Sequence, residues 1–169
     1  MRKRWLWISL MVIVVPLWLT ACSNNERAVR QTVEELADAV QSGLNRRNLN
    51  AVEPFFATPD EGANAAGLGE TWEALQTFAD QLGSSDQVQF HSFDVESVAV
   101  HEENKLARVT YRLHFSVVRN GLPIYSAVVT QNLALIRTSR GWRISGGDVP
   151  RLDDVTGQWP PRSSATTIP

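Results

Sequence analysis

The stretch RVTYRLHFSVVRNGLPIYSAVV, residues 108–129, decides the fold. Apolar and polar residues alternate through its first half, and the apolar set is Val109, Tyr111, Leu113, Phe115 and Val117. Such a period of two is typical of a β-strand that buries one face. Asn120-Gly121 then predicts a two-residue hairpin, because these residues tolerate the positive φ that both turn positions need. We therefore predict two long antiparallel strands joined by a tight turn.

The tight turn also predicts which residues pair across the hairpin. Arg119 would lie opposite Leu122, and Tyr111 opposite Thr130. The core face of the second strand would then carry Ile124, Val128 and Ile136, with Ser126, Thr130 and Asn132 interspersed. The other face of the hairpin would hold Arg112, His114 and Ser116 beside Tyr125, Ala127, Val129 and Leu133. That face is too apolar to lie wholly in water, which predicts a homodimer or another protein partner. A bulge near Gln131 would exchange the later assignments.

Helical patterns come before the strands. A helix is predicted from Glu26 onward, because apolar residues follow one face at helical spacing: Val29, Val33, Leu36, Val40 and Leu44. A short second helix would follow, with Asn50 and Glu53 as a weak capping box. Residues 61–70, EGANAAGLGE, are rich in small side chains and predict a mobile surface loop. A third helix is predicted from Thr71 or Trp72 to Leu82.

The remaining strands complete the predicted sheet. Apolar residues between Val88 and Val100 change parity, which predicts one or more bulges in a strand there. Residues 101–105 form a polar turn, residues 138–141 form another, and residues 142–144 form a last short strand. Helices followed by an antiparallel sheet predict an α+β fold.

Two segments resemble the nuclear transport factor 2-like superfamily, which includes ketosteroid isomerases and polyketide cyclases. They are LNRRNLNAV, residues 44–52, leading to Phe55 and Phe56, and GWRISGGDV, residues 141–149, which resembles the final strand of that family. The resemblance covers roughly residues 26–150 and implies a cone in which helices pack on a curved antiparallel sheet around a pocket.

The same resemblance gives an expectation about catalysis. The isomerases use a tyrosine and an aspartate, and a gapless comparison puts Val40 and Asn64 at those two positions. Neither residue can act as a general acid or base, so we expect no enzymatic activity. Asp60 could replace the aspartate after a loop shift. The alternatives are an isomerase, dehydratase or cyclase that uses the pocket, and a structural module for dimerisation or envelope assembly.

A ligand site is predicted on the core-facing surface. Trp72, Tyr111, Thr130 and Asn132 would share this surface and would bind a small apolar ligand through a few polar atoms. The alternative is that the aromatic residues only fill the core. His91, His101 and His114 have no metal-ligand spacing, and no cofactor motif is present, so we expect neither a metal nor a cofactor.

The N-terminus carries a targeting pattern. A basic start at residues 2–4 precedes an apolar run at residues 5–19, which is shorter than a membrane span and typical of a signal peptide. Leu19-Thr20-Ala21-Cys22 resembles the lipobox of bacterial lipoproteins, which implies cleavage before Cys22 and attachment of a diacylglyceryl group, with fatty acyl chains such as palmitate, to this cysteine. Cys22 is the only cysteine, so it cannot form an intramolecular disulfide.

This pattern predicts the organisation and location of the chain. We expect a signal peptide at residues 1–21, a lipidated tether at 22–26, the domain at 27–150 and a disordered Pro/Ser/Thr-rich tail at 151–169. The expected location is the extracytoplasmic side of a bacterial envelope membrane, inner or outer. Without residues 2–4 the chain has 13 Lys and Arg against 18 Asp and Glu, and an acidic body of this kind is a poor nucleic-acid binder. The favoured function is thus a non-enzymatic, membrane-anchored domain that binds a small apolar ligand or a protein partner.

Overall fold

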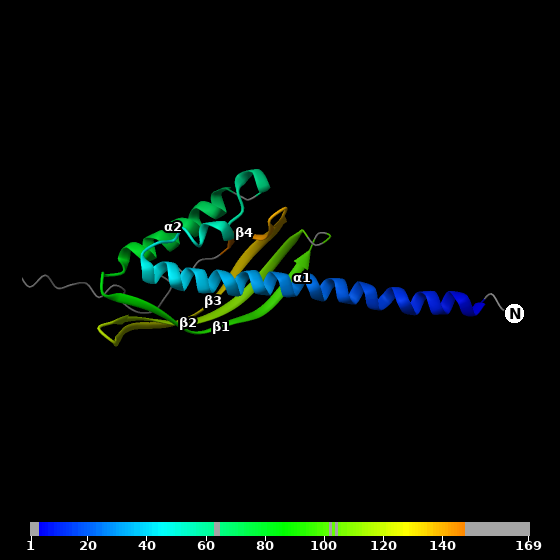
Figure 1. Cartoon of the computed structure of the whole chain (residues 1–169), viewed down its shortest axis with the longest axis horizontal. Coiled ribbons are helices and arrows are strands. Elements are labelled where there is room, and N and C mark those ends of the chain that lie inside the picture. The colour runs from blue at the N-terminus through cyan, green and yellow to red at the C-terminus, as the bar shows by residue number, and fades with distance from the viewer. Residues whose placement is uncertain (1–3, 63–64, 102, 104, 148–169) are drawn as a thin grey trace, which may run out of the picture.

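A computed structural model describes residues 4–62, 65–101, 103 and 105–147, with only the helical backbone described at 4–23 and 65–68. The elements in chain order are α1 (Arg4–Arg46), η1 (Glu53–Phe55), η2 (Pro59–Glu61), α2 (Ala65–Gln81), β1 (Asp86–His101), β2 (Leu106–Arg119), β3 (Leu122–Thr138) and β4 (Gly141–Gly147). The four strands lie in chain order in one antiparallel sheet. This is the predicted α+β architecture, with two helices packed on a curved sheet (Figure 1). The predicted tail at residues 151–169 lies outside the described residues.

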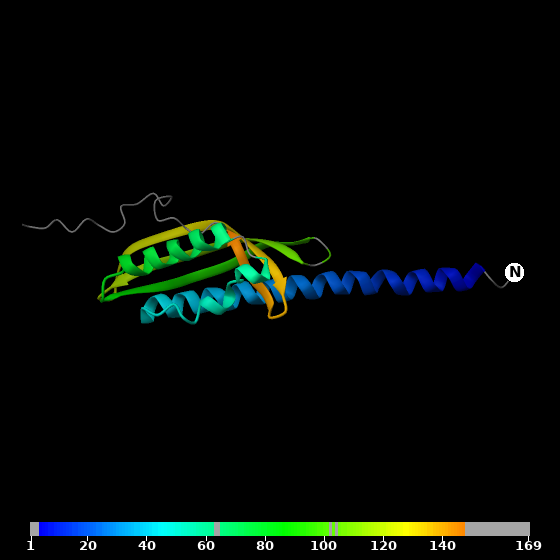
Figure 2. The ribbon, with the colours of Figure 1, turned by 90° about the horizontal axis from the view of Figure 1, so that it is seen from above.

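The first helix is longer than predicted. Its backbone is helical from Arg4, and it continues well past the end of the sheet (Figures 1 and 2). The apolar stripe is confirmed, because Val29, Val33, Leu36 and Leu44 are buried in the core. Among the helices of the described residues, none is both long and apolar enough to cross a membrane.

The segment between the helices differs from two predictions. Residues 65–70 are not a loop, because α2 already begins at Ala65. Alanine has the highest helix propensity, and this segment contains two adjacent alanines. The capping box lies around η2 and joins Thr58 to Glu61, whereas η1 has no side-chain cap.

Strand β1 confirms the predicted change of parity. Its pairing with β2 shifts between Phe90 and Ser92 and again between Val95 and Ser97. Each shift places one extra residue in β1, so that strand bends and the sheet curves around the helices.

The hairpin turn is confirmed, but the register beyond it is wrong. Asn120 and Gly121 have φ values of 52° and 80°, and Arg119 pairs with Leu122. Val118 then pairs with Pro123 and Val117 with Tyr125, so Ile124 is an extra residue without a partner on β2. This bulge lies close to the turn, not near Gln131. It shifts all later pairs by one residue, and Tyr111 faces Gln131 instead of Thr130.

The shift exchanges the two faces of β3. The side chains that are buried from β3 are Ala127, Val129, Leu133 and Leu135, which were mostly assigned to the outer face. Val128, which was assigned to the core, is 52% exposed. Ala127, Val129 and Leu133, three of the apolar side chains from which a homodimer was predicted, therefore belong to the core.

A cluster of polar contacts joins the ends of α1, β1 and β2. Asp86 is buried and accepts hydrogen bonds from Nε and Nη2 of Arg119, at 2.6 and 2.9 Å, and from the backbone N–H of Gly83, at 2.7 Å. The Arg47 guanidinium donates to the backbone carbonyls of Gly83 and Asp86. The side-chain amide of Asn45 donates to the carbonyl of Val88, and its oxygen accepts from the N–H of the same residue. These contacts fix the end of α1 against the sheet.

Candidate functional site

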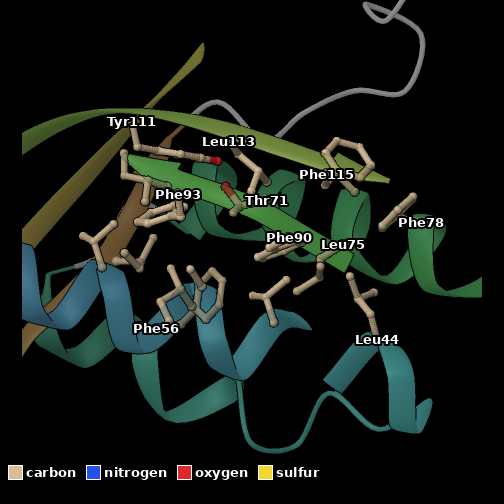
Figure 3. A pocket seen from close by; sticks show the side chains of 17 residues that line it. Leu44, Phe56, Thr71, Leu75, Phe78, Phe90, Phe93, Tyr111, Leu113 and Phe115 are labelled. Atoms are coloured by element: carbon tan, nitrogen blue, oxygen red, sulfur yellow. The ribbon is translucent and has the colours of Figure 1, made fainter. Parts of the chain in front are cut away.

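The main candidate site is a cavity of about 120 Å³ between the two helices and the inner face of the sheet. Every strand and both helices contribute to its wall, as does Phe56, which directly follows η1. Six aromatic side chains line it, as Figure 3 shows: Phe56, Phe78, Phe90, Phe93, Tyr111 and Phe115. Apolar walls with few polar groups are typical of sites that bind small molecules.

Local sequence patterns explain how these side chains reach the cavity. Residues 111, 113 and 115 point inward because they share one face of β2. On α2, Thr71, Leu75 and Phe78 lie on one helical face at spacings of four and three. On β1, the bulge between Phe90 and Ser92 lets both Phe90 and Phe93 face inward although they are three residues apart.

Aromatic contacts hold the wall in place. Phe78 packs edge to face on Phe115, with ring centroids 6.0 Å apart. The ring centroids of Phe93 and Tyr111 are 5.2 Å apart. Such pairs stabilise by about 0.5–1.5 kcal/mol beyond the burial of their area. The wall is therefore held in a defined shape by contacts between strands and helix.

Two hydroxyl groups lie on the wall of the cavity. The hydroxyl groups of Tyr111 and Thr71 are turned toward the same region of the cavity, as Figure 3 shows. Thr71 is 4% exposed, and its hydroxyl donates to the backbone carbonyl of Gly147 at 3.3 Å. Among the described residues that line the cavity, none is an Asp, Glu, His, Lys, Arg or Cys. Tyr111 and Thr71 are therefore the polar side chains of the described wall.

The structure separates the four predicted ligand residues. Tyr111 lines the cavity as predicted. Trp72 lies behind the wall, where its ring packs edge to face on Phe56 at 5.5 Å. Thr130 and Asn132 are exposed on the outer face, and Asn132 accepts a hydrogen bond from the Thr110 hydroxyl there. Their placement in the core was wrong because the bulge at Ile124 reverses the orientation of β3 side chains.

Thr71 was not among the predicted site residues. The sequence pattern indicates it only as a possible first residue of the helix. Its position four residues before Leu75 and seven before Phe78 is the signal that could have placed it on the inner face. Val40 lines the cavity at the position that the resemblance gave to a catalytic tyrosine, whereas Asn64 lies outside the described residues. Asp60 is exposed in η2.

The histidines of the described residues do not line the cavity. His91 and His114 are on the outer face of the sheet, with ring centroids 4.7 Å apart. Each ring shares a hydrogen bond with a serine, Ser116 for His91 and Ser126 for His114. Within the described part of the chain, no group of three or more His, Cys, Asp or Glu side chains could hold a metal ion.

Sequence comparison finds neither a family model nor a curated protein that matches this chain. Solved structures do match it. A proposed dehydratase of the NTF2-like family from Streptomyces avermitilis is 16% identical, with a TM-score of 0.51 over 72% of this chain and 95% of its own. An NTF2-like protein of unknown function from Shewanella oneidensis is 16% identical, with a TM-score of 0.45 over 70% and 95%. A proposed aromatic ring hydroxylase from Novosphingobium aromaticivorans is 17% identical, with a TM-score of 0.45 over 76% and 92%.

The Streptomyces neighbour corrects the expectation about catalysis. The absence of enzymatic activity was predicted because Val40 and Asn64 replace a tyrosine and an aspartate. That prediction is contradicted, since the Streptomyces neighbour with the same fold is a proposed dehydratase. The loss of one catalytic pair does not exclude chemistry from the fold. The architecture and the Streptomyces neighbour together show that the domain has the fold of an NTF2-like α+β cone.

Proposed function

We propose that this chain is a lipid-tethered protein of the bacterial cell envelope whose cone domain binds a small apolar molecule in its interior cavity. The observation that carries the binding part is the cavity of about 120 Å³ with an aromatic wall. An apolar cavity of about 150 Å³ stays dry and binds benzene, so a space of this size suits a single-ring molecule.

The wall composition supports an apolar ligand. Water in a cavity needs two to four polar partners, and the side chains of the described wall are apolar except for Tyr111 and Thr71. The side chains that line an empty cavity lack dispersion contacts on one side. A molecule that fills the apolar part supplies these contacts. Occupation by a ligand of the right shape is thus favourable.

The proposed tether depends on the N-terminal sequence. The basic start, the short apolar run and Leu-Thr-Ala-Cys at residues 19–22 together support signal cleavage and lipidation at Cys22. Cys22 and the buried Val29 belong to the same helix, which rises by about 10 Å between them. The anchor would therefore hold the domain close to the membrane surface.

Intact-mass analysis of protein extracted from membranes tests the tether. We expect a mass that begins at Cys22 and includes acyl chains. The full chain with Cys22→Ser should lack the acyl mass. A chain that keeps its initiator methionine, or that carries an unmodified thiol, would contradict the tether without affecting the cavity.

Toluene, as a single-ring apolar probe, tests the cavity. We expect toluene to raise the Tm of the purified full chain in a concentration-dependent way, because a ligand that binds only the folded state stabilises it. Ala74→Leu should abolish this shift, since Ala74 lines the cavity from α2 and a larger side chain there fills the space. Ala28→Leu is the matched control, because Ala28 is exposed on α1 and does not line the cavity. An equal shift in the Ala74→Leu variant would refute binding in this cavity.

A further inference from the structure

Four side chains on the outer face of the sheet bring together donor atoms that suit a metal ion. They are two histidines and two serines: His91, His114, Ser116 and Ser126. We propose that this histidine–serine cluster binds one Cu²⁺ or Ni²⁺ ion. None of the four residues lines the interior cavity, so the proposal goes beyond the proposed function and does not depend on it.

Strand pairing brings the four side chains together. Ser116 and Ser126 are direct partners on β2 and β3, and the Cβ atoms of such partners lie about 4.5–5.5 Å apart. The bulge in β1 sets both His91 and Ser92 opposite His114. The two imidazole rings are therefore neighbours, with centroids 4.7 Å apart.

One nitrogen of each ring faces this pair of serines. Nε2 of His91 lies 2.8 Å from the hydroxyl oxygen of Ser116. Nε2 of His114 lies 3.3 Å from the hydroxyl oxygen of Ser126. Because the two serines are partners across the strands, both nitrogens and both oxygens gather beside a single pair of strand positions. An ion placed between the rings would meet two nitrogen and two oxygen donors.

Small side-chain movements suffice to form the site. A bond between an imidazole nitrogen and a divalent ion such as Zn²⁺ is about 2.0–2.1 Å long, so the two Nε2 atoms must come within about 4 Å of each other. Rings whose centroids are 4.7 Å apart can reach this separation by rotation about their side-chain torsions. A neutral imidazole that keeps its proton on Nδ1 presents a lone pair to the ion at Nε2.

The cluster is accessible to ions from solvent. His91, Ser116 and Ser126 line a groove on the outer face, beside the hairpin turn. His91 and Ser126 are exposed, whereas Ser116 forms the buried floor at 3% exposure. Water from the groove can therefore complete the coordination of a bound ion.

The donor set favours Cu²⁺ and Ni²⁺ over other common ions. Imidazole nitrogen suits Zn²⁺, Cu²⁺ and Ni²⁺, whereas Mg²⁺ and Ca²⁺ prefer carboxylate and carbonyl oxygens. A planar set of nitrogen and oxygen donors is typical of Cu²⁺ and Ni²⁺, and Cu²⁺ binds most tightly in the divalent series. The positive charge of Arg112, two residues from His114, is offset by Asp94, which is its partner on β1.

Calorimetric titration with Cu²⁺ tests the cluster. The full chain carrying Cys22→Ser is used, so that a thiol does not compete for the ion. We expect one Cu²⁺ per chain and no binding of Mg²⁺. His91→Gln and His114→Gln should each weaken Cu²⁺ binding by at least about 10-fold, because even changes outside the direct ligands of a metal cost about 10- to 100-fold in affinity. His101→Gln is the matched control and should leave the affinity unchanged, because His101 is exposed at the end of β1 and outside the cluster.

Electron paramagnetic resonance of the same samples identifies the ligands. Cu²⁺ bound to the chain with all three histidines should show coupling to two imidazole nitrogens, and His91→Gln and His114→Gln should each remove one. A spectrum without two such couplings would overturn the proposal without the need for a folded variant. Unchanged affinity in either cluster variant would also overturn it, since the proposed site needs both rings, as would an equal loss of affinity in His101→Gln.

Discussion

Replacing Asp86 with asparagine should destabilise the domain by about 2–3 kcal/mol at pH 7. The side chain of Asp86 is fully buried, and its carboxylate accepts two hydrogen bonds from Arg119 and one from the Gly83 N–H. Asparagine has nearly the same shape, but its amide nitrogen would face one of these donors. Removing one partner of a buried ion pair costs about 3–5 kcal/mol. The Arg119 side chain is 43% exposed and can be hydrated, which favours a value below that range.

The effect should depend on pH with a definite sign. Hydrogen bonds from Arg119, supported by Gly83 and the charges of Arg119 and Arg47, hold the pKa of Asp86 below its ordinary value in the folded protein. A carboxyl whose pKa is lowered by folding contributes stability above its unfolded pKa, near 3.9, and loses it as pH falls toward the folded pKa. The difference between wild type and Asp86→Asn should therefore be largest at neutral pH and shrink near pH 3.

Urea unfolding followed by circular dichroism measures this difference. If the free energy of unfolding falls by about 2 kcal/mol per molar urea, the midpoint of Asp86→Asn should lie about 1–1.5 M below that of the wild type at pH 7. Asp80→Asn is the matched control, because Asp80 is exposed on α2, and its effect should stay within about 0.5 kcal/mol. A gap between wild type and Asp86→Asn that is as large at pH 3 as at pH 7 would show that the charged pair is not its source.

Three further predictions concern the core, the hairpin and the surface. Ile144→Ala should lower the free energy of unfolding by about 2–5 kcal/mol, because Ile144 is 0% exposed and its loss leaves a cavity; chemical denaturation measures this. Gly121→Ala should cost about 1–2 kcal/mol, since its φ of 80° disfavours a residue with a Cβ, and an unchanged Tm would contradict this. Glu61 should titrate near pH 2 by carbon-detected NMR, because its hydrogen bonds to Arg140 lower its pKa to about 2; its contribution to stability is present above its unfolded pKa and disappears as pH falls toward 2. A midpoint near that of an ordinary glutamate would refute the ion pair in solution.

Much of the fold was predictable because it is encoded over short distances. The apolar stripe of α1, the alternation in β2 and the Asn120-Gly121 turn each depend on neighbours within a few residues, and all three are confirmed. The early start of α2 was missed because the small residues before Thr71 indicated a loop, although alanine also favours a helix.

The candidate site was only partly predictable. Tyr111 was found because it follows a clean alternation on β2. Thr130 and Asn132 were misplaced because β3 has apolar residues at both parities, so its local pattern does not specify which face is buried. Trp72 lies behind Phe56 because the order of layers in a core depends on packing and not on helical spacing alone.

The sequence by itself determined the α+β class, the hairpin and its tight turn, and the pattern from which a lipid anchor is proposed at Cys22. These depend on local backbone preference, side-chain periodicity and a short motif. Only the tertiary structure decided that Ile124 bulges out, that Val129 and Leu133 turn inward, and that Thr71 and Tyr111 line the same aromatic cavity. The physical reason is that a one-residue shift reverses every side chain beyond it, and the packing of the sheet against α1 and α2 selects between the two registers.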